Sequence, residues 1–428
     1  MILIKKASIF ASSTPMKIQD ILVEGNMIQQ IDDHVSLHDL PPDASVEVIE
    51  ANERLVLPGM VNTHTHASMS LFQGFAEALP FQQWHQKVFP YELQLQSQHT
   101  YWGAMLSMID MIRSGTTMFN DMYIHMDGVA EAVKDIGMRA SLARGMIFAD
   151  DQVDQRIQDG VQFAQRWNGA ADGRITTMLA PHSLYLCSMD HLSRIGAIAY
   201  QESLPVHTHF LENASERTTI NEQTGRRPAE VLLDAGLIHA HVPLLLAHGI
   251  HVDDHDLTIL SQGNVSVSHC PGSNWKLGCG FFPLSAYEAY DIPVHLGTDG
   301  LSTSLSLDMY EQLHLCLLGQ RQYTGDMNYP SLEQLSHMVT DQGMRSLGHP
   351  LSGRLRPGYC ADLQLLDIRP RDRYPDVDEA YLMTHVLHQG LVNTTVIDGT
   401  IVMQDREIQT IDEEEVLYHV QQYKHQLR

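Results

Sequence analysis

The stretch LVLPGMVNTHTH (residues 55–66) begins as an apolar strand and ends in two histidines separated by one threonine. Side chains at positions i and i+2 of a strand share a face, so His64 and His66 should project together from its carboxyl end. Imidazole is the commonest protein ligand of zinc, which makes this strand end a candidate half of a metal site. The alternative is a chance pair in a chain that contains 25 histidines.

Seven further segments have the same character, being short, apolar or β-branched, and closed by polar or turn residues. They are 115–122, 139–146, 175–183, 204–212, 243–251, 264–271 and 292–300. Amphipathic stretches such as 99–115 and 127–138 lie between them and predict helices. Eight strands alternating with helices predict a (β/α)8 (TIM) barrel domain over residues 56–350, in the α/β class.

The two ends of the chain have a different pattern of apolar and polar residues from the middle. Residues 1–55 and 351–428 contain short alternating segments separated by turns, with few helix signals before a final helix over 412–427. Neither end could bury a core alone. We therefore expect residues 1–55 and 351–428 to combine into one small β-domain.

Composition excludes several classes of function. The formal net charge of −25 repels phosphate backbones, so nucleic-acid binding is not expected. No run of 18 apolar residues predicts a membrane span, and the first residues do not resemble a secretion signal. Five widely spaced cysteines without a CxxC pair favour a reducing cytoplasm over a disulfide framework.

Three other predicted strands also end in residues that carry chemistry. His209 and Glu212 close the fifth strand, where His209 is the better ligand candidate and His207 should line the barrel. His248 ends the very apolar run VPLLLAHG, and Asp299 lies in GTDG after the eighth strand. All of them fall at the carboxyl rim, where barrel active sites occur. Together they predict a metal centre of His64, His66, His209 and Asp299.

These residues and their motifs resemble the amidohydrolase superfamily nearly end to end, from PGMVNTHTH through HFLE, LLLAHGIH and LGTDG to GRLRPGYCADL. Within it the chain is most similar to the 5′-methylthioadenosine/S-adenosylhomocysteine deaminases. The resemblance implies a distorted barrel and a β-sandwich built from both termini. It also implies one zinc per subunit, although iron, manganese or nickel suit the same N/O ligands.

The resemblance assigns roles at matching positions. His64, His66, His209 and Asp299 match metal ligands, Asp299 and Glu212 match the proton-transfer pair, and His248 matches a histidine that helps to activate water. The fourth strand end, MLAPHS, lacks the lysine that bridges two metals in binuclear relatives. A mononuclear site is therefore expected.

Substrate contacts also carry over by position. Besides Glu212 and Asp299, the matching residues are Trp84, Glu92, Arg144, Arg156 and His182. Glu92 suits a ribose diol, and the two arginines match residues associated with the amino-acid tail of S-adenosylhomocysteine, because a guanidinium binds a carboxylate bidentately. Surface or strand-end ion pairs are the alternative for both arginines.

Several loops depart from the family pattern. They contain Gln73, Ala78, Cys270, Trp275, Cys279 and residues 301–304, where other residue types or a longer segment are common. These loops shape the substrate pocket and leave its specificity open.

The expected function is hydrolytic deamination of an adenine nucleoside or thionucleoside by a cytoplasmic homo-oligomer, a dimer or tetramer. The nearest alternative is an amidohydrolase acting on guanine, a pterin or an s-triazine, including chlorohydrolases. A non-catalytic paralogue is less consistent with the sequence, because every metal and proton-transfer position is filled.

Overall fold

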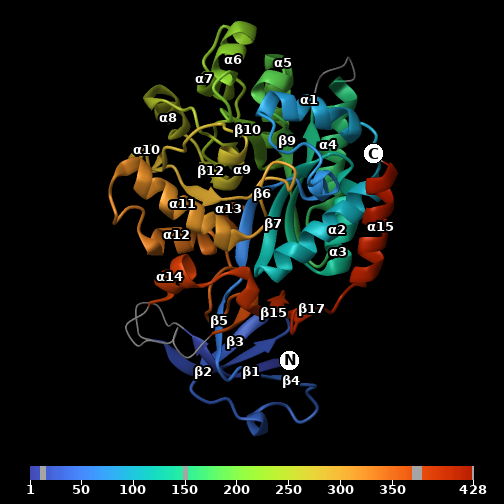
Figure 1. Cartoon of the computed structure of the whole chain (residues 1–428), viewed down its shortest axis with the longest axis vertical. Helices are drawn as coiled ribbons and strands as arrows, with labels where there is room; N and C mark the ends of the chain where they lie inside the picture. Colours follow the sequence, from blue (N-terminus) through green and yellow to red (C-terminus); the bar gives the residue numbers. More distant parts are fainter. Residues whose placement is uncertain (10–15, 148–152, 369–377, 427–428) are drawn as a thin grey trace.

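The barrel is formed by eight parallel strands that follow one another around the sheet in chain order. Figure 1 shows several of them among the surrounding helices. The computed structural model describes residues 1–9, 16–147, 153–368 and 378–426. The strands are β6 (Met60–Thr65), β7 (Thr116–Tyr123), β8 (Arg139–Met146), β9 (Ile175–Pro181), β10 (Val206–Phe210), β11 (Leu244–His248), β12 (Val265–His269) and β13 (Val294–Leu296). The predicted eight-stranded barrel is confirmed.

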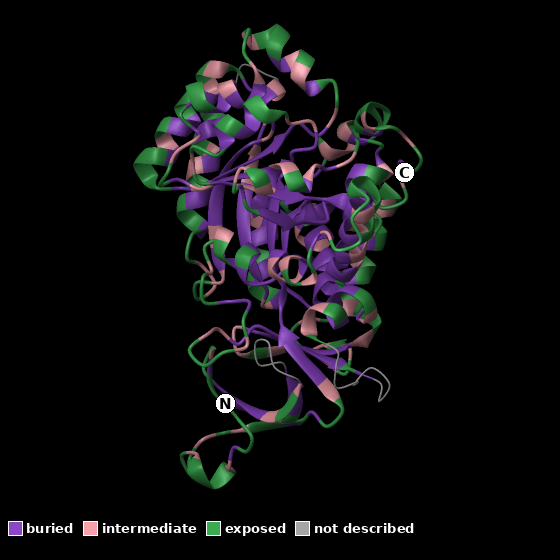
Figure 2. Cartoon of the chain, turned by 90° about the vertical axis from the view of Figure 1, so that its left-hand side faces the viewer, coloured by how far each residue is buried: buried purple, intermediate pink, exposed green. Residues whose placement is uncertain are grey.

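The edge strands β6 and β13 meet and nearly close the barrel. Thr63 donates its hydroxyl to the Leu296 carbonyl at 2.9 Å, and the backbone N–H of Asp299 reaches the His64 carbonyl at 2.9 Å. Strands such as β6, β7 and β11 are buried along their whole length, because helices cover them outside and side chains fill the interior. Figure 2 shows this buried centre surrounded by partly exposed helices.

The helices of the described residues surround the barrel. A few of them lie over its rim or at its edges. They are α1 (Phe81–Glu92), α2 (Ser97–Arg113), α3 (Met126–Ile136), α4 (Val153–Trp167), α5 (Met189–Glu202), α6 (Glu216–Thr224), α7 (Pro228–Asp234), α8 (Asp254–Leu260), α9 (Pro271–Lys276), α10 (Leu284–Ala289), α11 (Met309–Thr324), α12 (Leu332–Met338), α13 (Asp341–Ser346), α14 (Glu379–Tyr381) and α15 (Glu413–Gln426). The helices expected over 99–115 and 127–138 correspond to α2 and α3.

A second, mixed sheet joins the two ends of the chain below the barrel (Figure 1). Its strands are β1 (Ile2–Ile9), β2 (Lys17–Glu24), β3 (Met27–Asp32), β4 (Glu47–Glu50), β5 (Arg54–Pro58), β14 (Leu363–Asp367), β15 (Val392–Ile397), β16 (Thr400–Gln404) and β17 (Glu407–Ile408). The β5–β14 pair is antiparallel and links the N-terminal strands to the C-terminal ones. The expected β-domain made from both termini is therefore present.

The predicted strand over 55–66 is two strands, one in each sheet. β5 ends at Pro58 and β6 begins at Met60. A Cβ atom at the intervening Gly59 would lie 2.2 Å from the Thr117 side chain, so only glycine fits where the chain changes sheets. The domain boundaries between residues 55 and 56 and between residues 350 and 351 stay predictions.

β5 contributes to both apolar cores. Leu55 and Leu57 pack in the barrel cluster, whereas Val56 packs with Ile4, Ile21 and other residues of the terminal sheet. This alternation follows from the two-residue period of a strand. The segment that leads to the histidine pair is thus held by both parts of the molecule.

The last helix, α15, packs on α2, as its place beside the barrel in Figure 1 shows. Arg113 of α2 binds Glu413 through two N–H···O contacts of 2.8 and 2.7 Å. The acidic first turn of α15 matches the positive end of its helix dipole. Among the helices in the described ranges, we find none with the length and apolar character that crossing a membrane requires.

We predict that Arg139→Met destabilises the fold by about 3–5 kcal/mol, because the change leaves buried carboxylates without their cation. Arg139, at the start of β8, binds Asp362 at 2.9 Å and also contacts Asp398, and thereby links the barrel to the terminal sheet. Arg139 and Asp362 are 3% and 1% exposed. The measurement is the shift of the denaturation midpoint in urea.

The control is Lys134→Met, which removes an exposed ion pair with Glu131 at 3.3 Å. Such pairs contribute about 0–1 kcal/mol. Similar small shifts in both variants would show that the Arg139 contacts do not hold the two parts together.

Candidate active site

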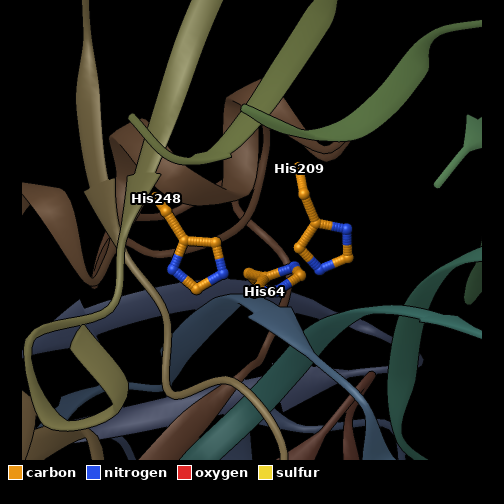
Figure 3. A group of neighbouring side chains, drawn as sticks. All are labelled: His64, His209 and His248. Carbon is orange, nitrogen blue, oxygen red and sulfur yellow. The ribbon is translucent and has the colours of Figure 1, made fainter. Parts of the chain in front are cut away.

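Three buried imidazoles from three different strands face one another at the carboxyl rim (Figure 3). They belong to His64 of β6, His209 of β10 and His248 of β11. One ring nitrogen from each lies within 4.8 Å of the others, a spacing that one metal ion could bridge. Because parallel strands all end at this rim, residues distant in sequence come together here.

A second group adds His66 and Asp299 to the same centre. Asp299 Oδ1 lies 3.7 Å from His64 Nε2 and 3.4 Å from His66 Nε2. The Nε2 atoms of His66 and His209 are 3.2 Å apart. The structure therefore brings the four predicted metal ligands together.

Backbone carbonyls orient two of these rings. His209 Nδ1–H donates to the His182 carbonyl at 2.7 Å, and His66 Nδ1–H donates to the carbonyl of Met122. In each ring this hydrogen bond selects the tautomer whose Nε2 lone pair points into the cleft. Such outer contacts are typical of metal-binding histidines.

Glycines on either side of Asp299 allow its close approach to the histidines. A Cβ at Gly297 would lie 2.8 Å from the His64 backbone nitrogen, and one at Gly300 would lie 2.8 Å from the Met69 sulfur. Asp299 itself has a left-handed φ of 65°, which is uncommon for a residue other than glycine. The GTDG sequence thus meets a steric requirement of the site.

The donor set fits a divalent metal ion. Among the described residues, His64 Nε2 and His248 Nε2 are buried and have no hydrogen-bond partner. Burial lowers the pKa of His64 and of His209, with a smaller effect from neighbouring histidines, and so favours the neutral rings that ligands require. A bound cation would satisfy His64 Nε2 and the Asp299 carboxylate together, and His248 Nε2 stays available to a molecule bound beside it.

Two buried carboxyl groups at the site have pKa values shifted in opposite directions. Burial, and secondarily Asp299, raises the pKa of Glu212 well above its usual range. Burial alone would also raise the pKa of Asp299, but His66, His248 and hydrogen bonds from Ser273 and Gly300 lower it below its ordinary value. A proton donor and a proton acceptor thus share one cleft.

His248 lies between these groups. Its Nδ1 lies 2.9 Å from Asn274 Oδ1, and its Nε2 lies 3.8 Å from Glu212 Oε1. With Nδ1–H donated to Asn274, Nε2 faces the cleft and Glu212. His248 is therefore placed to contact a molecule held between Glu212 and Asp299.

Sequence reasoning missed the partners that hold these groups. Ser273 donates to Asp299 Oδ2 at 2.7 Å, and Glu216 Oε1 accepts the Glu212 backbone N–H at 3.0 Å. Ser273 and Asn274 lie in the short helix α9. The available signal was this polar pair two and three residues after the strand predicted over 264–271.

Glu92, at the end of α1, lies beside the metal centre. Tyr123, which ends β7, donates its hydroxyl to Glu92 Oε1 at 2.6 Å, and its ring centroid lies 6.0 Å from that of His66. Burial raises the pKa of Glu92, although Tyr123 and His66 oppose the shift. The structure thus links Glu92 to His66 through Tyr123, and the role of Glu92 as a substrate contact stays a prediction.

His182 and Trp84 occupy different sides of the site. The His182 ring stacks on His209, with centroids 4.5 Å apart, and burial lowers its pKa to about 3. Trp84 of α1 is buried and donates its indole N–H to Ser302 Oγ at 2.9 Å. Trp84 thus links α1 to the segment that follows Asp299.

The two candidate arginines belong to β8 and α4. Arg144, near the end of β8, forms an ion pair with Asp159 of α4 at 2.8 Å. Arg156 lies half-buried in α4, three residues before Asp159. Arg144 therefore forms the strand-end ion pair that is the alternative to a substrate contact.

Comparisons with known proteins agree with this arrangement. Residues 55–402 match the amidohydrolase family. The 5-methylthioadenosine/S-adenosylhomocysteine deaminase of Dictyoglomus turgidum is 36% identical over 424 residues, which cover 98% of this chain and 97% of that protein. The 5′-deoxyadenosine deaminase of Methanocaldococcus jannaschii is 35% identical over 421 residues, with 97% of each covered. The crystal structure of an adenosine deaminase from Xanthomonas campestris with bound zinc has a TM-score of 0.90 and 25% identity, covering 100% of this chain and 98% of that one.

We predict that His209→Ala lowers the affinity for a divalent metal by more than about 100-fold, since even residues that only orient ligands contribute 10- to 100-fold. Metal per subunit is measured after equilibrium dialysis. Chelation should also lower the melting temperature of the unmodified protein and leave that of His209→Ala nearly unchanged.

The control is His251→Ala, which removes a half-buried histidine bonded to the Cys279 carbonyl at 2.7 Å. This variant should bind metal normally. Full metal occupancy in His209→Ala would contradict the assigned ligand set.

Proposed function

Because the chain belongs to the amidohydrolase family, we propose that it is a hydrolytic deaminase of adenine nucleosides or thionucleosides. Its substrates would be 5′-methylthioadenosine, S-adenosylhomocysteine, adenosine or 5′-deoxyadenosine, each converted to the inosine analogue and ammonia. The observation that carries this proposal is a buried group of Glu212, His248 and Asp299 beside the clustered histidines, in which the pKa of Glu212 is raised and that of Asp299 is lowered.

The metal we propose is one zinc ion per subunit, held by His64, His66, His209 and Asp299. Three imidazoles and a carboxylate are ligands that zinc accepts readily, and iron, manganese or nickel suit the same set less specifically. When bound, zinc lowers the pKa of water from about 16 toward 7 and so supplies a nucleophile at neutral pH.

The protein's own residues move the protons. Asp299 is ionised and accepts a proton from the attacking water at a carboxylate oxygen. Glu212 carries a proton that it donates to the purine ring nitrogen beside the reacting carbon. Asp299 then passes its proton to the departing amino group, which leaves as ammonia as the carbon–nitrogen bond breaks. The second proton of the water leaves the new hydroxyl as its carbon–oxygen double bond forms and returns to Glu212, which restores both carboxyl groups.

Other side chains hold the reactants. His248 Nε2 hydrogen-bonds the attacking water, while Asn274 fixes the ring through Nδ1. Ser273 donates its hydroxyl to Asp299 Oδ2 at 2.7 Å. The other carboxylate oxygen, Oδ1, faces His64 and His66. Glu92, supported by the Tyr123 hydroxyl, would accept hydrogen bonds from the ribose diol.

The second candidate is deamination or dechlorination of another heterocycle, such as guanine, a pterin or an s-triazine. The Glu92–Tyr123 pair favours a ribosyl substrate, because free bases and triazines have no diol to bind there. A homo-oligomer in the reducing cytoplasm remains part of our proposal, and the five free cysteines are consistent with that compartment.

The proposed function is tested by an ammonia-release screen on the zinc-loaded protein. The panel is adenosine, 5′-deoxyadenosine, methylthioadenosine, S-adenosylhomocysteine, guanine, a pterin and aminotriazines. Turnover confined to the adenine nucleosides supports the proposal, and turnover confined to guanine, the pterin or triazines contradicts it.

We predict that Glu212→Gln lowers kcat by about 100- to 10,000-fold, since the amide cannot donate the acidic proton. Zinc content should stay at the unmodified level, because Glu212 is outside the ligand set. Steady-state kinetics and metal analysis on the same preparation measure both quantities.

Glu230→Gln makes the same exchange at a surface carboxyl that bonds His255 at 3.0 Å, and its kcat should be unchanged. Unaltered turnover in Glu212→Gln would contradict the assignment of Glu212 as the proton donor.

A further inference from the structure

Glu216, the first residue of α6, is a buried acid that binds the segment carrying Glu212. It is 3% exposed, although acidic side chains are seldom buried without partners. Its Oε1 accepts three N–H groups, from the Glu212 backbone at 3.0 Å, the Asn213 backbone at 3.2 Å and the Asn213 side chain at 3.1 Å. The Glu216 backbone N–H in turn reaches the Asn213 carbonyl at 3.2 Å. One residue therefore closes the turn that leads from Glu212 into α6.

These bonds hold one side of the peptide group that precedes Glu212. The other side is the Leu211 carbonyl, which accepts the backbone N–H groups of Ile250 at 3.0 Å and His251 at 3.2 Å. Both donors lie in the segment that follows β11. The peptide plane between Leu211 and Glu212 is thus fixed at its oxygen and at its nitrogen, and this plane sets the direction in which the Glu212 side chain leaves the backbone.

The backbone needs such support at this point. Leu211 has a left-handed φ of 48°, a conformation that is unfavourable for a non-glycine residue and persists only where the surroundings enforce it. Without the Glu216 bonds the peptide is held on one side only, and Glu212 is free to turn away from His248, whose Nε2 lies 3.8 Å from Glu212 Oε1. A misplacement of about 1 Å is enough to slow an enzymatic reaction about 100-fold.

Glu216 can hold this turn without a negative charge. Burial, and secondarily Glu212, raises the pKa of Glu216 to about 8. Below that pH most Glu216 side chains are protonated, and a protonated carboxyl still accepts hydrogen bonds at its other oxygen. The acceptor atom, rather than the charge, therefore supports the turn.

We infer that Glu216 is a positioning residue for the proton donor, which fixes the Glu212 backbone so that the Glu212 side chain faces the reactants. The inference rests on the proposed function, in which Glu212 gives a proton to the substrate. Glu216 acts through Glu212 and takes no part in the proton transfer itself. The alternative is that Glu216 only stabilises the first turn of α6, where acids are favourable in any helix.

The test replaces Glu216 in two ways and uses the best substrate of the ammonia-release screen on zinc-loaded protein. Glu216→Leu removes the acceptor and should lower kcat about 100-fold, with KM within about threefold and zinc content unchanged. Glu216→Gln is the isostere of the protonated carboxyl and retains an oxygen acceptor, so its kcat should stay within about fivefold of the unmodified value.

Glu216→Asp tests the same contact in a residue that also suits the first turn of a helix. Its side chain is one methylene too short to make the Glu212 contact, and kcat should fall about tenfold or more. The matched control is Glu230→Leu, which removes a comparable first-turn contact in α7, to the Arg227 backbone N–H at 3.1 Å. The control should keep the unmodified kcat.

A double variant separates positioning from a general effect on folding. In Glu212→Gln the proton donor is already absent, so adding Glu216→Leu should lower kcat by less than about threefold more, because residues that act as a unit are not additive. A purely structural role would instead reduce kcat by the same factor with Glu212 or Gln at that position.

The inference is overturned if kcat falls as far in Glu216→Gln as in Glu216→Leu, or if Glu216→Leu and Glu216→Asp both keep the unmodified kcat. It is also overturned if the losses of Glu212→Gln and Glu216→Leu add in the double variant. An unmodified enzyme that releases ammonia from none of the adenine nucleosides would instead contradict the proposed function.

Discussion

The site depends on buried imidazole nitrogens that have no hydrogen-bond partner in the part of the chain that the structure describes. These are His64 Nε2 and His248 Nε2, and the Asp299 carboxylate lies beside His64 and His66. Burying such groups unpaired is costly. A divalent cation held by His64 and Asp299 offsets part of this cost, and a bound molecule that His248 Nε2 can reach offsets the rest, so the packing of these rings suits a metal site with a reactant beside it.

Three non-glycine residues at the same rim have a strained backbone. Leu211, His248 and Asp299 all have left-handed φ values, of 48°, 71° and 65°, although none is a glycine. Each follows or ends a barrel strand, where the chain turns sharply so that a side chain reaches the cleft. Residues in this region of φ are sparse elsewhere in proteins and gather at functional sites. The barrel supplies the rigid frame that holds them there.

Much of the fold and of the metal centre was predictable, because both depend on local patterns. Short apolar runs ending in His66, His209, His248 or Asp299 mark barrel strands, and parallel topology then brings their ends together. The change of sheet at Gly59 was not predictable, because it depends on the approach of Thr117 from another strand. No spacing rule links Tyr123 to Glu92, or Asp159 to Arg144, across separate elements. Such contacts depend on how separate elements pack, which is why sequence patterns identify the metal-binding and proton-transfer candidates of this site more readily than the partners around them.

The pairing of β5 with β14 has a consequence for biosynthesis. Pro58 and Leu363 are neighbours in the sheet, although about 300 residues separate them along the chain. At a translation rate of roughly 5 to 20 residues per second, β5 waits on the order of 15 to 60 s for its partner to be made. During that interval the apolar strand that precedes the first histidine pair has an open edge, a state that invites association with other chains. The nascent protein should therefore be a client of chaperones until its C-terminal strands emerge.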